Sequence, residues 1–121
     1  AAKAPIGLAP RRVHGFDSFE GLPEQWRVGF PASTFGRGGE PPQLPHDNID
    51  FVVGWFNATV PPFFAERRGE PVALAHIDCD VYSAATTVLA HLRPHLRVGT
   101  LLVFDELINY GGAQSHEFRA V

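Results

Sequence analysis

The stretch that organises this chain is His76-Ile-Asp-Cys-Asp-Val-Tyr82, and it has a counterpart in Val103-Phe-Asp-Glu106. In each stretch a short apolar run ends abruptly in carboxylates. The apolar runs at 71–77 and 99–104 lack the strict alternation of a half-exposed strand, which predicts two strands of a parallel sheet covered on both faces. A helical pattern over 83–93 lies between them. Strand, helix and strand predict a βαβ unit, whose crossover returns the second strand parallel to the first.

Acidic residues are expected to gather at one edge of this sheet, because the carboxyl ends of neighbouring parallel strands meet there. They are Asp78, Asp80, Asp105 and Glu106. No Lys or Arg lies within either motif, so the acids spread into water, or some are protonated, or a cation lies among them. Oxygen ligands favour Mg²⁺ over Zn²⁺, since thiolate and imidazole form no closed set here. The competing interpretation is that acids at strand ends cap helices or are simply solvated.

Composition narrows the class of protein. A length of 121 residues predicts a single domain of modest size, and the net charge of -3 gives no reason to expect a nucleic-acid partner. The chain has no apolar run of membrane-spanning length and no signal-peptide pattern at its start, so we expect a cytoplasmic protein without a membrane partner. Its single cysteine, Cys79, excludes an internal disulfide. Because Cys79 lies between two acids, we expect a buried small residue rather than a nucleophile.

Two further stretches indicate a site for a nucleoside. A predicted strand at 13–17 ends in Asp17, and an acid at this place can accept hydrogen bonds from both hydroxyls of a ribose. The alternative is that Asp17 or Ser18 caps a helix. Further along, Trp55 and Phe56 could stack on a planar ligand such as a nucleobase, although aromatic pairs more often belong to the core.

The remaining segments are less informative. Residues 27–47 are rich in Gly and Pro and form a loop too long for a plain connector, so they are a lid, an insertion or a partly disordered segment. A strand is predicted at 49–53 and a short helix at 62–68, with Pro in its first turn. Ser83 is expected to cap the helix after the acidic motif. Another helix is predicted to start near 115.

Four segments together resemble the macrocin O-methyltransferase family. They are VHGFDSFEGLPE (13–24), GWFNATVP (54–61), HIDCDVYS (76–83) and GTLLVFDELINY (99–110). Members of that family are S-adenosylmethionine-dependent, Mg²⁺-assisted sugar O-methyltransferases of antibiotic biosynthesis. The resemblance implies an α/β fold with a Rossmann-like, mostly parallel sheet and flanking helices. It implies a single partial domain over 1–121, a truncated class I methyltransferase core of about four strands that carries the 27–47 loop as an insertion.

The resemblance also implies a binding site for the methyl donor. Asp17 matches the acid that holds the ribose of S-adenosylmethionine, and Ser18 lies beside it. Trp55 and Phe56 match a segment near the adenine. Asn57 departs from the pattern, because the family often has Asp at this position, and this puts one contact with the donor in question.

For the chemistry, the resemblance implies that Asp78, Asp105 and Glu106 are metal ligands and that Asp80 is the general base. The implied reaction is metal-assisted methyl transfer to a hydroxyl of a sugar or secondary metabolite. A metal at an acceptor hydroxyl lowers the pKa of that hydroxyl and orients it. A nearby carboxylate then removes the proton.

One element of the family is not found in the sequence. No glycine turn like that of the family's first strand precedes Val13. In the usual order that strand lies between the strands at 13–17 and 71–77, so a slot is expected in the sheet. It must close by direct pairing, be filled by a strand of a partner, or be occupied by residues before Arg11. An unfilled slot would be an apolar edge prone to association, so a homo-oligomer is expected.

Three functions therefore remain open. The first is a methyltransferase acting on a small-molecule hydroxyl acceptor. The second is a truncated, non-catalytic relative that acts as an oligomer or a partner-binding module. The third is a metal-dependent phosphohydrolase using His76, Asp78 and Asp80, which is disfavoured because no phosphate-binding Lys or Gly-rich helix start accompanies these residues.

Overall fold

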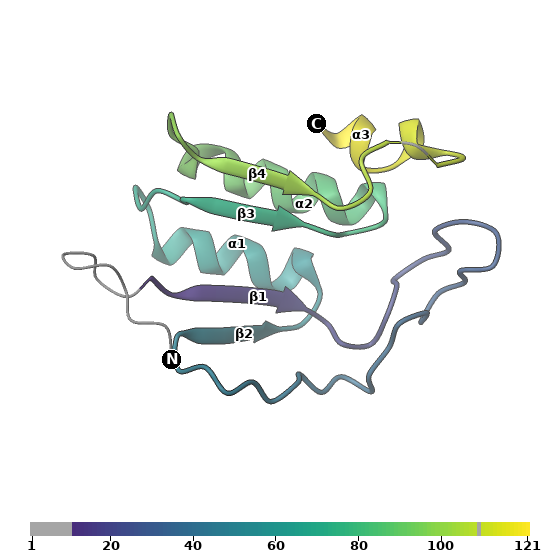
Figure 1. Ribbon diagram of the computed structural model, residues 1–121, viewed down its shortest axis with the longest axis horizontal. Coiled ribbons are helices and arrows are strands. Elements are labelled where there is room, and N and C mark those ends of the chain that lie inside the picture. The colour runs from purple at the N-terminus through teal and green to yellow at the C-terminus, as the bar shows by residue number, and fades with distance from the viewer. Residues whose placement is uncertain (1–10, 109) are drawn as a thin grey trace.

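The computed structural model describes residues 11–108 and 110–121, which alternate between strands and helices (Figure 1). The elements are β1 (Val13–Asp17), β2 (Ile49–Val53), α1 (Phe56–Glu66), β3 (Leu74–Ile77), α2 (Tyr82–Leu92), β4 (Leu101–Phe104) and α3 (Glu117–Ala120). Short 3₁₀ turns follow α2 and precede α3. The described strands run the same way, so their carboxyl ends lie along one edge.

The described strands form two parallel pairs. β1 pairs with β2, with Val13 opposite Ile49, and β3 pairs with β4, with Leu74 opposite Leu101. No ladder joins β1 to β3 within the described residues, and Figure 1 shows these two strands facing each other across the break. The slot expected from the sequence is therefore present. Direct pairing does not close it, and the residues before Arg11 that could occupy it lie outside the described residues.

The core lies between the β3–β4 pair and α2. Its buried side chains are Ile77, Cys79, Ala85 and Leu92, and partly buried residues of α1 and β4 pack against them. The β1–β2 pair is connected to this core through α1, which contacts both β1 and α2. The packing of α1 and α2 therefore fixes the carboxyl ends of both strand pairs relative to each other.

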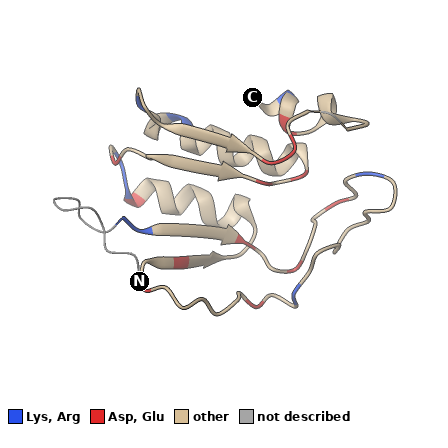
Figure 2. Ribbon diagram, viewed as in Figure 1, with Lys and Arg blue, Asp and Glu red and all other residues tan. Residues whose placement is uncertain are grey.

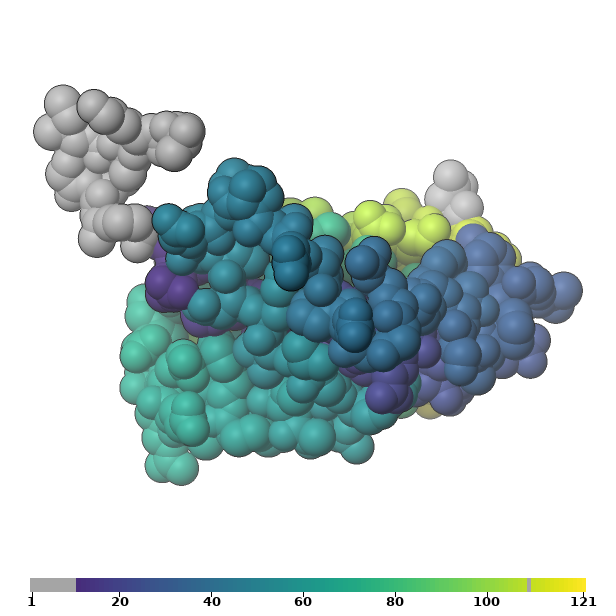
Figure 3. All heavy atoms as spheres, turned by 90° about the horizontal axis from the view of Figure 1, so that it is seen from below, coloured from purple at the N-terminus to yellow at the C-terminus, as the bar shows by residue number. Residues whose placement is uncertain are grey.

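Both long helices lie behind the strands in Figure 1, and Figure 3 shows the teal atoms of α1 on one side of the purple atoms of β1. On the β3–β4 pair, the side chains of Leu74 and Leu101 are more than half exposed, and Val103 is 39% exposed. The apolar runs led us to expect that both faces of the sheet are covered. That expectation is wrong for the described part of the β3–β4 pair. The two runs are continuously apolar because apolar residues lie on both faces of each strand. The face that no helix covers therefore exposes apolar side chains.

Two helices begin earlier than the sequence predicted. α1 starts at Phe56 and contains Pro61 and Pro62. These prolines cannot donate to the helix, but Val60 is only 2% exposed and its packing stabilises the segment. α2 starts at Tyr82 without a side-chain cap, so the capping role expected of Ser83 is wrong. Within the described residues, no helix is both long enough and apolar enough to cross a bilayer.

The Gly/Pro-rich loop folds back on the segment that follows β1. The Leu22 N–H donates to the carbonyl of Thr34 at 3.0 Å, and the Ser33 N–H donates to the carbonyl of Leu22 at 2.8 Å. Gly21 has a φ of 91°, and a Cβ there would lie 2.5 Å from the Ser33 carbonyl oxygen, so only glycine fits. The first half of the loop is therefore held next to the carboxyl end of β1.

A pair of identical substitutions tests where the core lies. Leu92→Ala is expected to lower the free energy of unfolding by about 2–4 kcal/mol, because Leu92 is 3% exposed and its loss leaves a cavity. Leu74→Ala, at a side chain 57% exposed, is expected to cost less than about 1 kcal/mol. Urea unfolding followed by tryptophan fluorescence measures both. Equal losses would contradict this placement of the core.

Candidate functional site

Acids follow the carboxyl ends of β1, β3 and β4 (Figure 2). The Asp105 N–H donates to the carbonyl of Ile77 at 3.1 Å, which continues the β3–β4 pairing and brings the two acidic motifs together. One ligand atom from each of His76, Asp78 and Asp105 lies within 4.8 Å of the other two. Asp78 and Asp105, two of the three predicted metal ligands, are thus brought together.

Glu106 lies outside that group, and His76 is found in it. The Oε2 atom of Glu106 is buried and has no hydrogen-bond partner among the described residues. His76 Nε2 lies 3.9 Å from Asp105 Oδ1, and both side chains are about half exposed. Sequence reasoning used His76 only for the phosphohydrolase alternative. Strand alternation was the missed signal, because residues 76 and 78 lie on the same face.

Like charges crowd this edge of the sheet. Burial raises the pKa of Asp78, and the Asp105 carboxylate adds to the rise, whereas His76 opposes it. Burial also raises the pKa of Asp80 to about 6, with the Asp78 and Glu106 charges acting in the same direction. A bound cation would stabilise the ionised forms of these groups, so the donor set suits a hard divalent ion.

These raised pKa values predict how stability depends on pH. The unfolded chain loses the Asp80 proton near its ordinary pKa of 3.8, whereas the folded chain keeps it to about pH 6. Between these values the folded state binds more protons, so its stability falls as the pH rises. We expect the thermal midpoint in EDTA to fall from pH 4 to pH 6, less steeply in Asp80→Asn, and Mg²⁺ at pH 7.5 to raise it. A midpoint that climbs through this range would contradict the crowding.

Asp80 lies in a strained turn. Its φ is 61°, in the left-handed region that non-glycine residues rarely adopt. The Val81 N–H donates to the carbonyl of Cys79 at 2.6 Å, so the chain reverses over three residues in the rare form of the γ-turn. Cys79 is 8% exposed, which confirms that it is buried, and burial raises the pKa of its thiol to about 12, which argues against a nucleophile.

A cleft of about 430 Å³ joins the ends of β1 and β3, a size within the range of small-molecule sites. All four residues predicted for the donor line it, together with Asp78, Asp80 and two residues of the Gly/Pro-rich loop. The predicted donor residues are Asp17, Ser18, Trp55 and Phe56, and the loop contributes Thr34 and Phe35. Sequence reasoning did not place Thr34 and Phe35 here, because their position depends on the fold of the loop.

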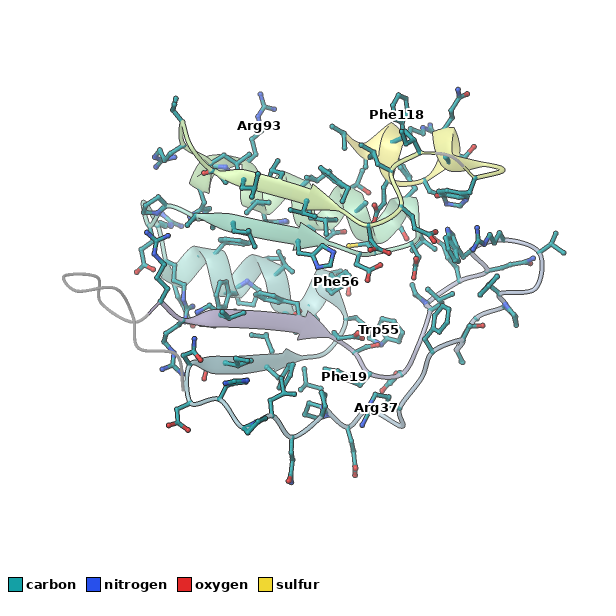
Figure 4. The ribbon with its side chains drawn as sticks, in the orientation of Figure 1. Phe19, Arg37, Trp55, Phe56, Arg93 and Phe118 are labelled. Atoms are coloured by element: carbon teal, nitrogen blue, oxygen red, sulfur yellow. The ribbon has the colours of Figure 1, made fainter. Side chains whose placement is uncertain are left out.

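The structure also bears on the alternative roles of the predicted donor residues, which were a local cap for Asp17 and core packing for the aromatic pair. Asp17 Oδ1 accepts the Phe19 N–H at 2.8 Å, so one oxygen stabilises the local turn and does not cap a helix. Phe56 packs against the core, and Trp55 is 39% exposed. Figure 4 shows Trp55 near the carboxyl end of β1 and Phe56 on the side toward β3. Trp55 therefore has the freer ring of the two for stacking on a ligand.

Comparison with known proteins identifies the fold family. A family profile described as "Methyltransferase domain" matches residues 2–107. The chain belongs to the methyltransferase domain family. Its fold matches the crystal structure of CalS11, described as a calicheamicin methyltransferase, with a TM-score of 0.70 and 32% identity over 91% of this chain and 50% of that one. A second CalS11 structure, described as an apo TDP-rhamnose 3'-O-methyltransferase, gives a TM-score of 0.63 at 33% identity.

Two curated relatives of this methyltransferase domain are named as O-methyltransferases. The 8-demethyl-8-(2,3-dimethoxy-alpha-L-rhamnosyl)-tetracenomycin-C 4'-O-methyltransferase of Streptomyces olivaceus is 29% identical over 83% of this chain. The mycinamicin III 3''-O-methyltransferase of Micromonospora griseorubida is 35% identical over 50% of it. The chain spans about half the length of these relatives or less. The resemblance to macrocin-type sugar O-methyltransferases and the class I methyltransferase core are confirmed.

Proposed function

We propose that this methyltransferase domain catalyses Mg²⁺-assisted methyl transfer from S-adenosylmethionine to a hydroxyl of a sugar. The observation that carries the proposal is the cleft that Asp17, Asp78 and Asp80 line together. The acid proposed to bind the ribose, one proposed metal ligand and the proposed general base thus share one ligand space. The names of the relatives, which mention rhamnosyl or TDP-rhamnose acceptors, support a deoxysugar as the substrate class.

The donor fits the β1 end of the cleft. Asp17 would hold the ribose hydroxyls through the carboxylate oxygen that the Phe19 N–H does not use. Trp55 offers an accessible ring for the adenine, whereas Phe56 packs against the core. Ser18 is less free to bind the donor, because it is 7% exposed and its Oγ accepts the Glu20 N–H at 3.1 Å.

The metal fits the carboxyl ends of β3 and β4, where Asp78 belongs both to the cleft and to the group with His76 and Asp105. Asp78 and Asp105 would provide oxygen ligands, and His76 would orient Asp105. When bound, S-adenosylmethionine supplies the methyl group, and Mg²⁺ supplies positive charge that lowers the pKa of the acceptor hydroxyl. Asp80, with a pKa of about 6, is largely ionised at neutral pH and would accept the hydroxyl proton on its carboxylate.

A non-catalytic, partner-binding role is the second candidate, and the slot in the sheet favours it. The facing edges of β1 and β3 have no partner strand among the described residues. Edges of this kind pair readily with another chain, so a homo-oligomer is part of the proposal.

The net charge of -3 and the acidic strand ends support a small-molecule acceptor rather than nucleic acid.

Calorimetric titration with S-adenosylmethionine, with and without Mg²⁺, tests the proposal. We expect saturable donor binding that Asp17→Asn weakens at least about tenfold, since a hydrogen bond to a charged group is lost. Transfer of labelled methyl to TDP-rhamnose tests the acceptor. A donor dissociation constant of about 1 mM or weaker would favour the non-catalytic role.

A further inference from the structure

Glu117 is the most deeply buried charged residue among those that the structure describes. It begins α3 and is 1% exposed. The sequence predicted only that a helix starts near this point, and none of the proposed roles uses this residue. A buried carboxylate is costly unless it is hydrogen-bonded, so its contacts point to the reason for its position.

Its main contact is with the backbone of the acidic motif. Glu117 Oε1 accepts the Cys79 N–H at 2.7 Å, across 38 positions of sequence. Burial raises the pKa of Glu117, and hydrogen bonding to the backbone at Cys79 and Asp80 opposes the rise. The Oε2 atom has no partner among the described residues. Glu117 thus acts on the turn mainly through one acceptor atom.

The turn that Glu117 contacts requires outside support. Asp80, with a φ of 61°, is at the centre of the three-residue reversal from Cys79 to Val81. A non-glycine residue in this conformation is strained and persists only where its surroundings hold it. The Glu117 acceptor holds the first amide of the reversal. Nearby, Arg119 of the same helix lies 4.7 Å from the ring centre of Tyr82, just beyond the turn.

We propose that Glu117 is a positioning residue: its Oε1 fixes the Cys79 amide and thereby the turn that directs Asp78 and Asp80 into the cleft. The inference rests on the roles proposed above for those two acids. It predicts that metal binding depends on how far the acceptor oxygen extends from the backbone of α3 and not on the charge of the side chain. Glu117→Gln keeps an oxygen at the same reach, whereas Glu117→Asp keeps the charge and withdraws the oxygen by one methylene.

The test measures Mn²⁺ binding to the 121-residue chain by electron paramagnetic resonance of the free ion, below the thermal midpoint of each variant. We expect Glu117→Asp to weaken Mn²⁺ binding at least tenfold and Glu117→Gln to change it less than about threefold. Phe118→Ala, at a side chain 51% exposed on the same helix, is the control and should bind as the wild type does. Wild-type affinity in Glu117→Asp, or equal losses in Asp and Gln, would overturn the proposal.

Amide exchange gives a readout that does not need the metal. The Cys79 amide proton should exchange slowly in the wild type and in Glu117→Gln, and at least tenfold faster in Glu117→Asp. A wild-type chain that fails to bind Mn²⁺ would contradict the proposed metal centre alone, and the exchange rates would still decide the role of Glu117. Equal exchange rates in all variants would overturn the inference whatever the metal result.

Discussion

Asp80→Asn is expected to lower kcat for methyl transfer to TDP-rhamnose by about 10²–10⁴-fold, the usual contribution of a general base. The amide cannot accept the hydroxyl proton, whereas it occupies nearly the same volume as the carboxylate. Asparagine has the same side-chain shape as aspartate and should adopt the positive φ of 61° found at Asp80 as readily, so the turn should persist. Labelled methyl transfer at saturating donor measures the effect.

Binding measurements separate lost chemistry from lost structure in this variant. The dissociation constants for S-adenosylmethionine and Mn²⁺ should stay within about threefold of wild type, because Asp80 is proposed to bind neither. Asp47→Asn makes the same substitution at an exposed loop residue and should leave kcat unchanged. If Asp80→Asn retained wild-type kcat, another group would have to accept the proton.

Asp105→Asn is expected to weaken Mn²⁺ binding by about 10–100-fold, because it removes a charged ligand from the group formed with His76 and Asp78. In EDTA the same variant should be more stable than the wild type. The Asp105 carboxylate contributes to the raised pKa of Asp78, and its removal relieves that repulsion. The variant thus has opposite effects on metal binding and on metal-free stability.

Paramagnetic resonance of free Mn²⁺ and thermal unfolding with and without the ion measure these two effects. Asp47→Asn again provides the control and should change neither quantity. Unchanged Mn²⁺ affinity in Asp105→Asn would place the metal elsewhere or remove it from the proposal. A metal-free protein destabilised by the substitution would indicate that Asp105 is held by favourable contacts rather than crowded by like charges.

The strands and the acidic edge were predictable from short apolar runs that end in carboxylates. Parallel pairing places strand ends together by geometry alone, which is why Asp78 and Asp105 were expected near each other and are found there. The early start of α1 was not predictable, because Pro61 and Pro62 argue against a helix through that segment and packing outweighs them. Local preference is a weak guide where a side chain such as Val60 is fully buried.

Contacts between segments distant in sequence could not be predicted. The Glu117 bond to Cys79 and the approach of Thr34 to the cleft both depend on how loops return to the sheet. The periodicity of apolar residues carries no information about where a loop comes back to the sheet. His76 differs, since alternation along β3 would have placed it beside Asp78 had that pattern been applied to polar residues too. The roles of the donor residues, by contrast, came from the family resemblance, and the structure adds only that they line one cleft.

Because the two strand pairs are not joined by hydrogen bonds among the described residues, a ligand bound between them should also affect the rigidity of the domain. Among the described residues, β1 is linked to the β3–β4 pair through α1 and its packing on α2, and no backbone ladder joins β1 to β3. A molecule bound by both Asp17 and the acids after β3 would therefore connect the two strand pairs directly. Ligand binding should stiffen the whole domain as well as fill the cleft, and donor and metal should each favour the binding of the other.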